Sequence, residues 1–69
     1  MFSYKPLWRI LVEKEMTRTE MREALGLSSS TLAKMGKGEY VSLEVIDKLC
    51  TYFEVQPNYI IEHQKEKEG

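Results

Sequence analysis

The sequence has few of the residues that mark disulfide-bonded, metal-binding and membrane proteins. It contains one cysteine and one histidine in 69 residues. A lone cysteine cannot form an intramolecular disulfide, and His63 has no second ligand-type residue at metal-ligand spacing. No apolar run approaches the ~20 residues that a membrane span needs, and no signal-peptide core is present. These absences favour a reduced, cytoplasmic protein that makes no membrane contact.

Signatures of catalysis are also missing. No glycine-rich phosphate loop follows a strand, and no pair of acids stands in a recognisable pocket motif. Ser28 to Ser30 form a run of serines, but no base partner is indicated, and helix capping accounts for Ser28. We therefore expect no enzyme activity, no catalytic residue, no cofactor and no metal. A small-molecule effector is not evident either.

Length and composition indicate one small globular domain. A chain of this size buries only ~60% of the surface that it exposes when unfolded, so it is marginally stable alone. Such chains often gain stability by association. The hydrophobic fraction of 42% is normal for a folded domain. We expect no separate sensory domain, so a signal would have to act through a partner, through the protein's own concentration, or not at all.

The charge is unevenly distributed along the chain. The net charge is −1, but residues 17–38 hold four Lys or Arg residues against two acids, whereas residues 39–69 hold three lysines against seven acids. This asymmetry would orient the central segment toward phosphate. It predicts a nucleic-acid contact there, with modest non-specific affinity.

That central segment has the pattern of two short helices joined by a tight turn. Thr17 and Glu20 form a capping box for the first helix, and Met16 and Met21 occupy the positions of a hydrophobic staple. Gly26 suits the left-handed position that ends a helix, and Ser28 is a strong N-cap for the next one. The apolar residues that should hold the two helices together are Met21, Leu25, Leu27, Leu32 and Met35. Two helices that share these contacts must cross steeply, as in a helix-turn-helix unit.

The second of these helices has an outward face of small polar residues and cations. That face carries Ser29, Ser30, Ala33 and Lys34, with Lys37 just beyond the helix end. No acid occurs between Glu23 and Glu39. Because an α-helix just fits the major groove, short side chains allow it to approach the bases closely.

The chain resembles the Cro/C1-type (XRE-like) helix-turn-helix regulators. The resemblance runs from about Tyr4 to Glu62 and is most specific in the run TLAKMGKGEYVSLEVIDKLC. It is strongest to the small single-domain members of Gram-positive bacteria and their mobile elements. Two positions depart from the family pattern, since Arg18 stands where glutamine is usual and Arg22 where alanine is usual. We expect the Arg22 stem to lie along the crevice between the helices with its charge in solvent.

The resemblance implies an all-α, compact, five-helix lambda-repressor-like domain that binds duplex DNA sequence-specifically as a transcriptional regulator. It implies that the helix of residues 28–36 lies in the major groove, with Ser29, Ser30, Ala33 and Lys34 facing bases and Arg18 facing a phosphate. It also implies a homodimer on a two-fold site. The expected DNA-binding residues are Thr17, Arg18, Arg22, Ser28, Ser29, Ser30, Thr31, Ala33, Lys34 and Lys37.

The rest of the chain should form the support for this motif. A first helix should begin near Ser3 to Lys5 and end at about Lys14, with Trp8 as a core anchor rather than a base-stacking residue. Ser42 should cap a fourth helix, whose apolar face includes Cys50 as a core thiol. Pro57 should begin a fifth helix. The predicted domain covers residues 1–62, with the motif at 17–36 and a charged, frayed tail at 63–69.

Two alternatives compete with DNA binding. The motif pattern also fits a plain helical hairpin in a small bundle. The domain could also be a protein–protein module that docks a partner on the apolar face of its fourth and fifth helices. Part of the apolar surface of the fifth helix, Tyr59, Ile60 and Ile61, should close the core. The remainder, with Tyr52 and Phe53 nearby, is the candidate dimer surface, and the alternative is that all of it is core. The exposed face of residues 28–36 discriminates between these hypotheses, because a partner-binding helix should display aromatic residues, and none is present there.

Overall fold

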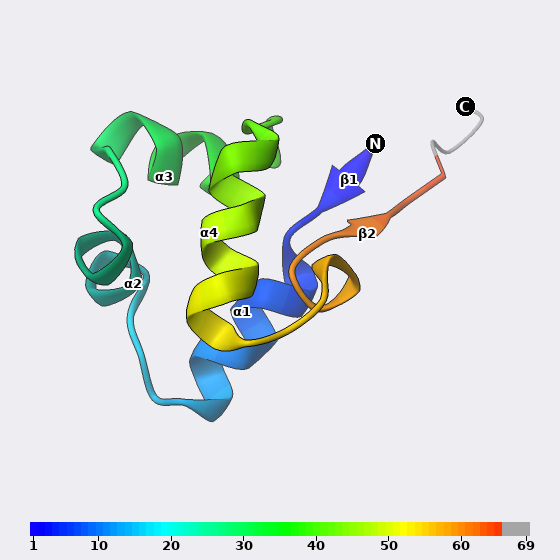
Figure 1. The fold of residues 1–69 in the computed structure, drawn as a ribbon. Coiled ribbons are helices and arrows are strands. Elements are labelled where there is room, and N and C mark those ends of the chain that lie inside the picture. Colours follow the sequence, from blue (N-terminus) through cyan, green and yellow to red (C-terminus); the bar gives the residue numbers. More distant parts are fainter. Residues whose placement is uncertain (66–69) are drawn as a thin grey trace.

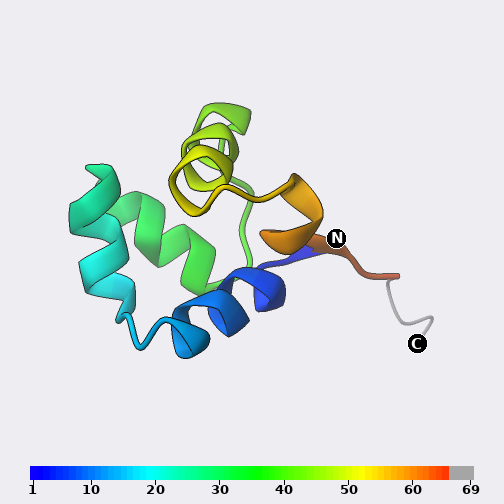
Figure 2. The same ribbon diagram turned by 60° about the horizontal axis from the view of Figure 1, so that its bottom comes forward.

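The computed structural model describes residues 1–65, which are mostly helical (Figures 1 and 2). The elements, in chain order, are β1 (Phe2–Ser3), α1 (Lys5–Glu13), α2 (Arg18–Leu25), α3 (Ser29–Gly36), α4 (Leu43–Phe53), the 3-10 helix η1 (Pro57–Tyr59) and β2 (Glu62–His63). No helix within residues 1–65 is long and apolar enough to cross a membrane.

The helices begin and end where the capping residues predict. The Thr17 hydroxyl accepts a hydrogen bond from the Glu20 N–H at 3.0 Å, and the Thr17 N–H donates to the Glu20 carboxylate at 3.0 Å, so the capping box is confirmed. The Ser42 side chain caps α4 by accepting from the Val45 N–H at 3.3 Å. The prediction for the first helix is also confirmed, since α1 ends at Glu13 with Lys14 as its C-cap.

The prediction of five α-helices is wrong. The described residues contain four, and the segment expected to form a fifth makes only the three-residue turn η1. Pro57 does stand in the first turn of η1, as predicted. The turn stops at once because Ile60 is drawn into the core, where none of its surface is exposed, and the chain then leaves in an extended conformation.

That extended segment pairs with the N-terminus of the chain. β1 and β2 are antiparallel, with Phe2 opposite His63 and Ser3 opposite Glu62. Beyond the strands, the Gln64 N–H donates to the Met1 carbonyl at 2.8 Å. The sequence predicts a charged, frayed tail at residues 63–69. His63 and Gln64 instead belong to this pairing, and residues 66–69 of the expected tail lie outside the described residues.

The core lies between α4 and the other helices (Figure 1). Its buried members are Tyr4, Leu7, Leu11, Met21, Leu27, Met35, Ile46, Leu49, Phe53 and Ile60. α1, α2, α3 and α4 all contribute, so the packing that stabilises the fold also sets the angle between α2 and α3. The Tyr4 hydroxyl links this core to the loop after α3 through a hydrogen bond, which it donates to the Glu39 carbonyl at 2.7 Å.

Cys50 is half-buried beside this core. Burial raises the pKa of its thiol, and the nearby charge of Asp47 raises that pKa further. Because the thiolate is the reactive form, the structure agrees with the prediction of an unreactive, packed thiol.

Candidate nucleic-acid interface

The turn between α2 and α3 has the geometry that its glycine predicts. Gly26 is left-handed, with φ 68° and ψ 29°. The Leu27 N–H donates to the Arg22 carbonyl at 2.9 Å, which closes the end of α2. Leu27 then points into the core with 6% of its surface exposed. α3 therefore leaves the turn in a direction held by both the backbone and the core.

The Arg22 side chain folds back over the turn between the two helices, and its charged group has protein partners instead of lying wholly in solvent as expected. Its side chain is 28% exposed, and its Nη1 donates to the Leu27 carbonyl at 3.4 Å. Its Nη2 stands 3.7 Å from the Glu23 carboxylate. Arg22 thus helps to hold the turn, and the acid beside it partly neutralises its charge.

α3 presents the outward face that was predicted. Ser29, Ser30, Ala33 and Lys34 are all exposed, whereas Met35 on the opposite side is buried. A helix of eight residues is about 12 Å long at 1.5 Å per residue. An α-helix with its side chains is about 10–12 Å across, which fits the major groove of about 12 Å, and the short side chains of this face allow a close approach to the bases.

Three hydroxyl groups gather at the N-terminus of α3. The Ser28 hydroxyl accepts from the Thr31 N–H at 3.1 Å, which confirms Ser28 as the N-cap. It also lies 3.1 Å from the Ser30 hydroxyl and 2.9 Å from the Thr31 hydroxyl. The hydroxyl groups of Ser28, Ser30 and the half-buried Thr31 are therefore engaged with one another at the helix end. The hydroxyl of Ser29 lies outside this cluster.

The N-terminus of α2 carries Arg18 in a defined position. Its guanidinium carbon lies 3.8 Å from the centre of the Trp8 ring. Trp8 packs against the core from α1, as predicted for a core anchor, but its ring also supports this cation. This contact could not be predicted from the sequence, because the two residues stand on different helices and no local pattern links them.

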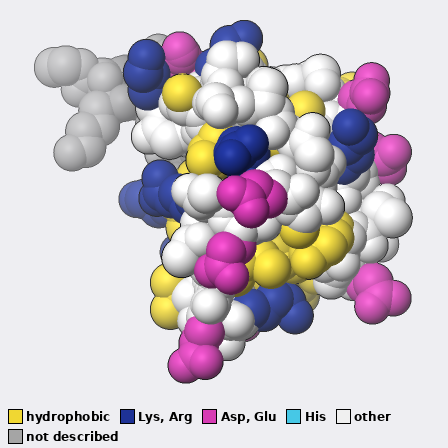
Figure 3. All heavy atoms as spheres, turned by 90° about the vertical axis from the view of Figure 1, so that its left-hand side faces the viewer, with side chains coloured by type: hydrophobic (Ala, Val, Ile, Leu, Met, Phe, Trp, Pro, Cys, Tyr) yellow, Lys and Arg dark blue, Asp and Glu magenta, His cyan; other side chains and the backbone are white. Residues whose placement is uncertain are grey.

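The charge of this surface is mixed rather than uniformly basic. Within residues 1–65 the only ion pair joins Arg22 to Glu23, so Arg18, Lys34 and Lys37 are not neutralised by direct carboxylate contacts there. Figure 3 shows the side of the molecule on which α2 and α3 lie in Figure 1, and both basic and acidic side chains occur on it. The modest non-specific affinity expected from the charge distribution stays a prediction.

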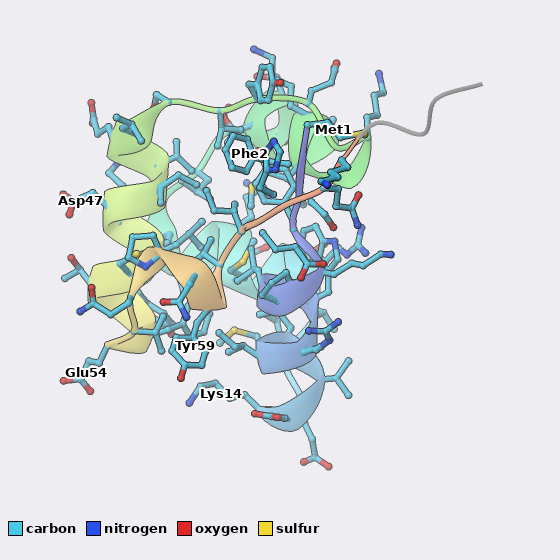
Figure 4. The ribbon with its side chains drawn as sticks, turned by 90° about the vertical axis from the view of Figure 1, so that its right-hand side faces the viewer. Met1, Phe2, Lys14, Asp47, Glu54 and Tyr59 are labelled. Carbon is cyan, nitrogen blue, oxygen red and sulfur yellow. The ribbon has the colours of Figure 1, made fainter. Side chains whose placement is uncertain are left out.

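The structure divides the candidate dimer surface between core and exterior. Ile60 is fully buried and Phe53 is 8% exposed, so these two belong to the part that closes the core and are not available to a partner. Tyr52 and Tyr59 are 46% and 56% exposed. Figure 4 shows the side that faces away from the viewer of Figure 3, where Tyr59 projects from η1.

Comparisons with known proteins agree on the kind of domain. The model of the Cro/C1-type helix-turn-helix DNA-binding domain matches residues 6–66. The uncharacterized HTH-type transcriptional regulator YozG of Bacillus subtilis (strain 168) is 28% identical over 61 residues, which are 86% of this chain and 73% of YozG. The crystal structure of the transcriptional regulator VanUg, Form II, is similar with a TM-score of 0.90 and 45% identity, over 94% of this chain and 87% of that chain.

Proposed function

The chain belongs to the family of Cro/C1-type helix-turn-helix DNA-binding domains, and from this premise we propose that it binds duplex DNA sequence-specifically as a transcriptional regulator. α3 enters the major groove, and α2 lies across the sugar-phosphate backbone. A regulator of this kind works where the DNA is, which fits the cytoplasmic location expected from the sequence.

The observation that carries the proposal is the exposed face of α3. Ser29, Ser30, Ala33 and Lys34 are exposed together on one short helix, and the capped turn holds that helix against the core. Lys34 is the only one of the four that is long and charged enough to reach guanine O6 and N7. The serines can bond to bases or phosphates, and Ala33 can contact a thymine methyl group.

The remaining predicted residues are proposed to position the protein on the backbone. Arg18, Arg22 and Lys37 supply positive charge for phosphates. The amides at the starts of α2 and α3, next to Thr17 and Ser28, supply N–H donors and a favourable dipole. Thr31 contributes through the hydroxyl cluster that shapes the start of α3.

Selection of binding sites from a random duplex pool tests the proposal directly. We expect an enriched palindromic sequence, and the enriched site then serves in quantitative titrations. If each protomer neutralises about three to five phosphates, log K should fall with log salt at a slope of roughly −3 to −5 per protomer. A pool without enrichment, together with binding that is insensitive to salt, would exclude DNA as the ligand.

Two substitutions separate base contacts from phosphate contacts. Lys34→Ala should cost ~1–3 kcal/mol at the selected site and relax the preference at one position per half-site. Arg18→Ala should weaken all duplexes about equally and reduce the salt slope by roughly one. Affinities for the selected and a scrambled duplex at one salt concentration distinguish the two roles. An equal loss on both duplexes for Lys34→Ala would make Lys34 a phosphate contact.

We also propose that two protomers bind one operator. A single α3 spans only a few base pairs, so useful specificity needs two helices about one turn of DNA apart, ~34 Å. Tyr52 and Tyr59 are the exposed aromatic residues of the surface expected to form the contact. Sedimentation velocity with and without the operator duplex measures the stoichiometry. One protomer per duplex at saturation would refute the dimer.

The alternative function is a protein–protein module, and the burial of the apolar face of α4 argues against it. Of the apolar face proposed to dock a partner, Ile46, Leu49 and Phe53 are buried in the domain's own core. Moreover, no aromatic residue is present on the outward face of α3.

A further inference from the structure

Arg18 and Trp8 form a stacked pair between α2 and α1. The guanidinium carbon lies 3.8 Å from the ring centre, well within the distance of about 6 Å at which a cation–π contact forms. Trp8 is half-buried and packs against the core, whereas Arg18 is exposed. The ring is therefore the fixed member of the pair, and the guanidinium is the member that solvent or a ligand can reach.

The same guanidinium also approaches the end of α3. A Cβ atom added at Gly36 would lie 3.6 Å from Arg18 Nη1, so Arg18 reaches from the start of α2 to the last residue of α3. Lys37, the C-cap of α3, follows directly and is exposed. Two cations from different elements thus stand at the same end of the proposed recognition helix.

Stacking leaves the hydrogen-bonding edge of the guanidinium available. The ring contacts the flat face of the group, and the N–H donors of arginine lie in its plane. An arginine side chain carries about 2 kcal/mol of rotamer entropy, and a group already held in its bound position loses less of this entropy on binding. A guanidinium held in place by the ring can therefore donate two parallel hydrogen bonds to the oxygens of one phosphate.

We propose that Trp8 is a positioning residue for DNA binding: it holds the Arg18 guanidinium beside the end of α3, ready to receive a backbone phosphate. This inference rests on the proposed DNA-binding function and deepens it. Trp8 touches no DNA and acts through Arg18. Lysine at position 18 would keep the charge but lose the flat stacked face, so it would not substitute fully.

A double-mutant cycle measures this coupling. Its variants are Trp8→Leu, Arg18→Ala and the double variant, with affinity for the selected duplex measured by fluorescence anisotropy and folding by circular dichroism. Because Arg18 is exposed, we expect Trp8→Leu to weaken binding by ~2- to 5-fold, the range of an exposed cation–π contact. In the Arg18→Ala background, Trp8→Leu should have no further effect. Trp8→Phe retains an aromatic face and should lose less affinity than Trp8→Leu.

Arg9 provides the matched control, because it is an exposed cation next to Trp8 on the same helix. Trp8→Leu should weaken binding by the same factor with Arg9→Ala as without it. Trp8 is also the only tryptophan of the chain, so its emission should change in Arg18→Ala and stay unchanged in Arg9→Ala.

Several results would overturn the proposal. An equal effect of Trp8→Leu with and without Arg18 would make Trp8 a purely structural residue. Unaltered affinity in Trp8→Leu would show that the stack is irrelevant to binding. Should Trp8→Leu fail to fold, Trp8→Phe and Arg18→Lys replace it in the cycle, and additive losses would again contradict the coupling. A wild-type protein that binds no duplex overturns the proposed function as well, whereas duplex binding without coupling overturns only this inference.

Discussion

Replacing Gly26 by alanine tests the turn that sets the direction of α3. Gly26 has φ 68°, and a Cβ atom built there would meet no atom within 4 Å. The cost is therefore not a clash but the left-handed backbone itself, about 1–2 kcal/mol for an L-residue. Alanine also lowers the entropy of the unfolded chain, which offsets roughly 0.4–1 kcal/mol. We expect a net loss of about 1 kcal/mol in the free energy of unfolding.

Urea denaturation followed by circular dichroism measures this loss as a lower midpoint at an unchanged slope. In a domain of this size, 1 kcal/mol corresponds to a fall in Tm of roughly 4–8 °C. Gly26→Asn should lose less than Gly26→Ala, because asparagine tolerates the left-handed region better. Gly38, with φ 74° and an equally open surrounding, should respond to alanine as Gly26 does.

Gly36→Ala is the matched control. Gly36 is the last residue of α3 and has no positive φ, and the added Cβ would make an ordinary contact at 3.6 Å with Arg18 Nη1. Alanine is the better helix former, so this variant should be as stable as the wild type or up to about 1 kcal/mol more stable. Equal destabilisation by alanine at positions 26 and 36 would refute the reasoning, since it would show that backbone handedness does not decide the cost.

Three further predictions concern stability. The hydrogen bond from the Thr17 N–H, followed by that from the Thr17 side chain, holds the pKa of the Glu20 carboxyl below its ordinary value of 4.5. The stabilising contribution of Glu20 should therefore be complete above pH 4.5 and be lost as the pH falls through the lowered pKa. Glu20→Gln should show a weaker pH dependence of its melting temperature in that window, and an unchanged profile would contradict the capping box. Ile60→Ala should lower the free energy of unfolding by ~2–5 kcal/mol, since Ile60 is fully buried. Tyr59 is exposed, so Tyr59→Ala should change it by no more than about 0.5 kcal/mol. Comparable melting temperatures for the two variants would show that η1 does not close the core. Tyr4→Phe removes the 2.7 Å hydrogen bond to the Glu39 carbonyl. Urea denaturation should show a free energy of unfolding lower by about 1 kcal/mol, and an unchanged value would show that this hydrogen bond does not stabilise the fold.

The sequence by itself determined the helix-turn-helix unit. Thr17, Gly26, Ser28 and Ser42 mark helix ends because each satisfies backbone groups only a few residues away, and those local bonds form in the structure as expected. The exposed face of α3 followed from the same short-range periodicity. Local chemistry of this kind does not depend on how the rest of the chain is arranged, so it can be inferred from neighbouring residues alone.

Only the tertiary structure decided how the ends of the chain and the support of Arg18 are arranged. Phe2 pairs with His63 across almost the whole sequence, and two-residue strands are too short to show a periodic pattern. Competition for the core buried Ile60 and left Tyr59 exposed, which ended the expected fifth helix after one turn. Trp8 contacts Arg18 because the fold brings the start of α2 beside α1. That placement depends on the shared core to which all four helices contribute and not on any single stretch of residues.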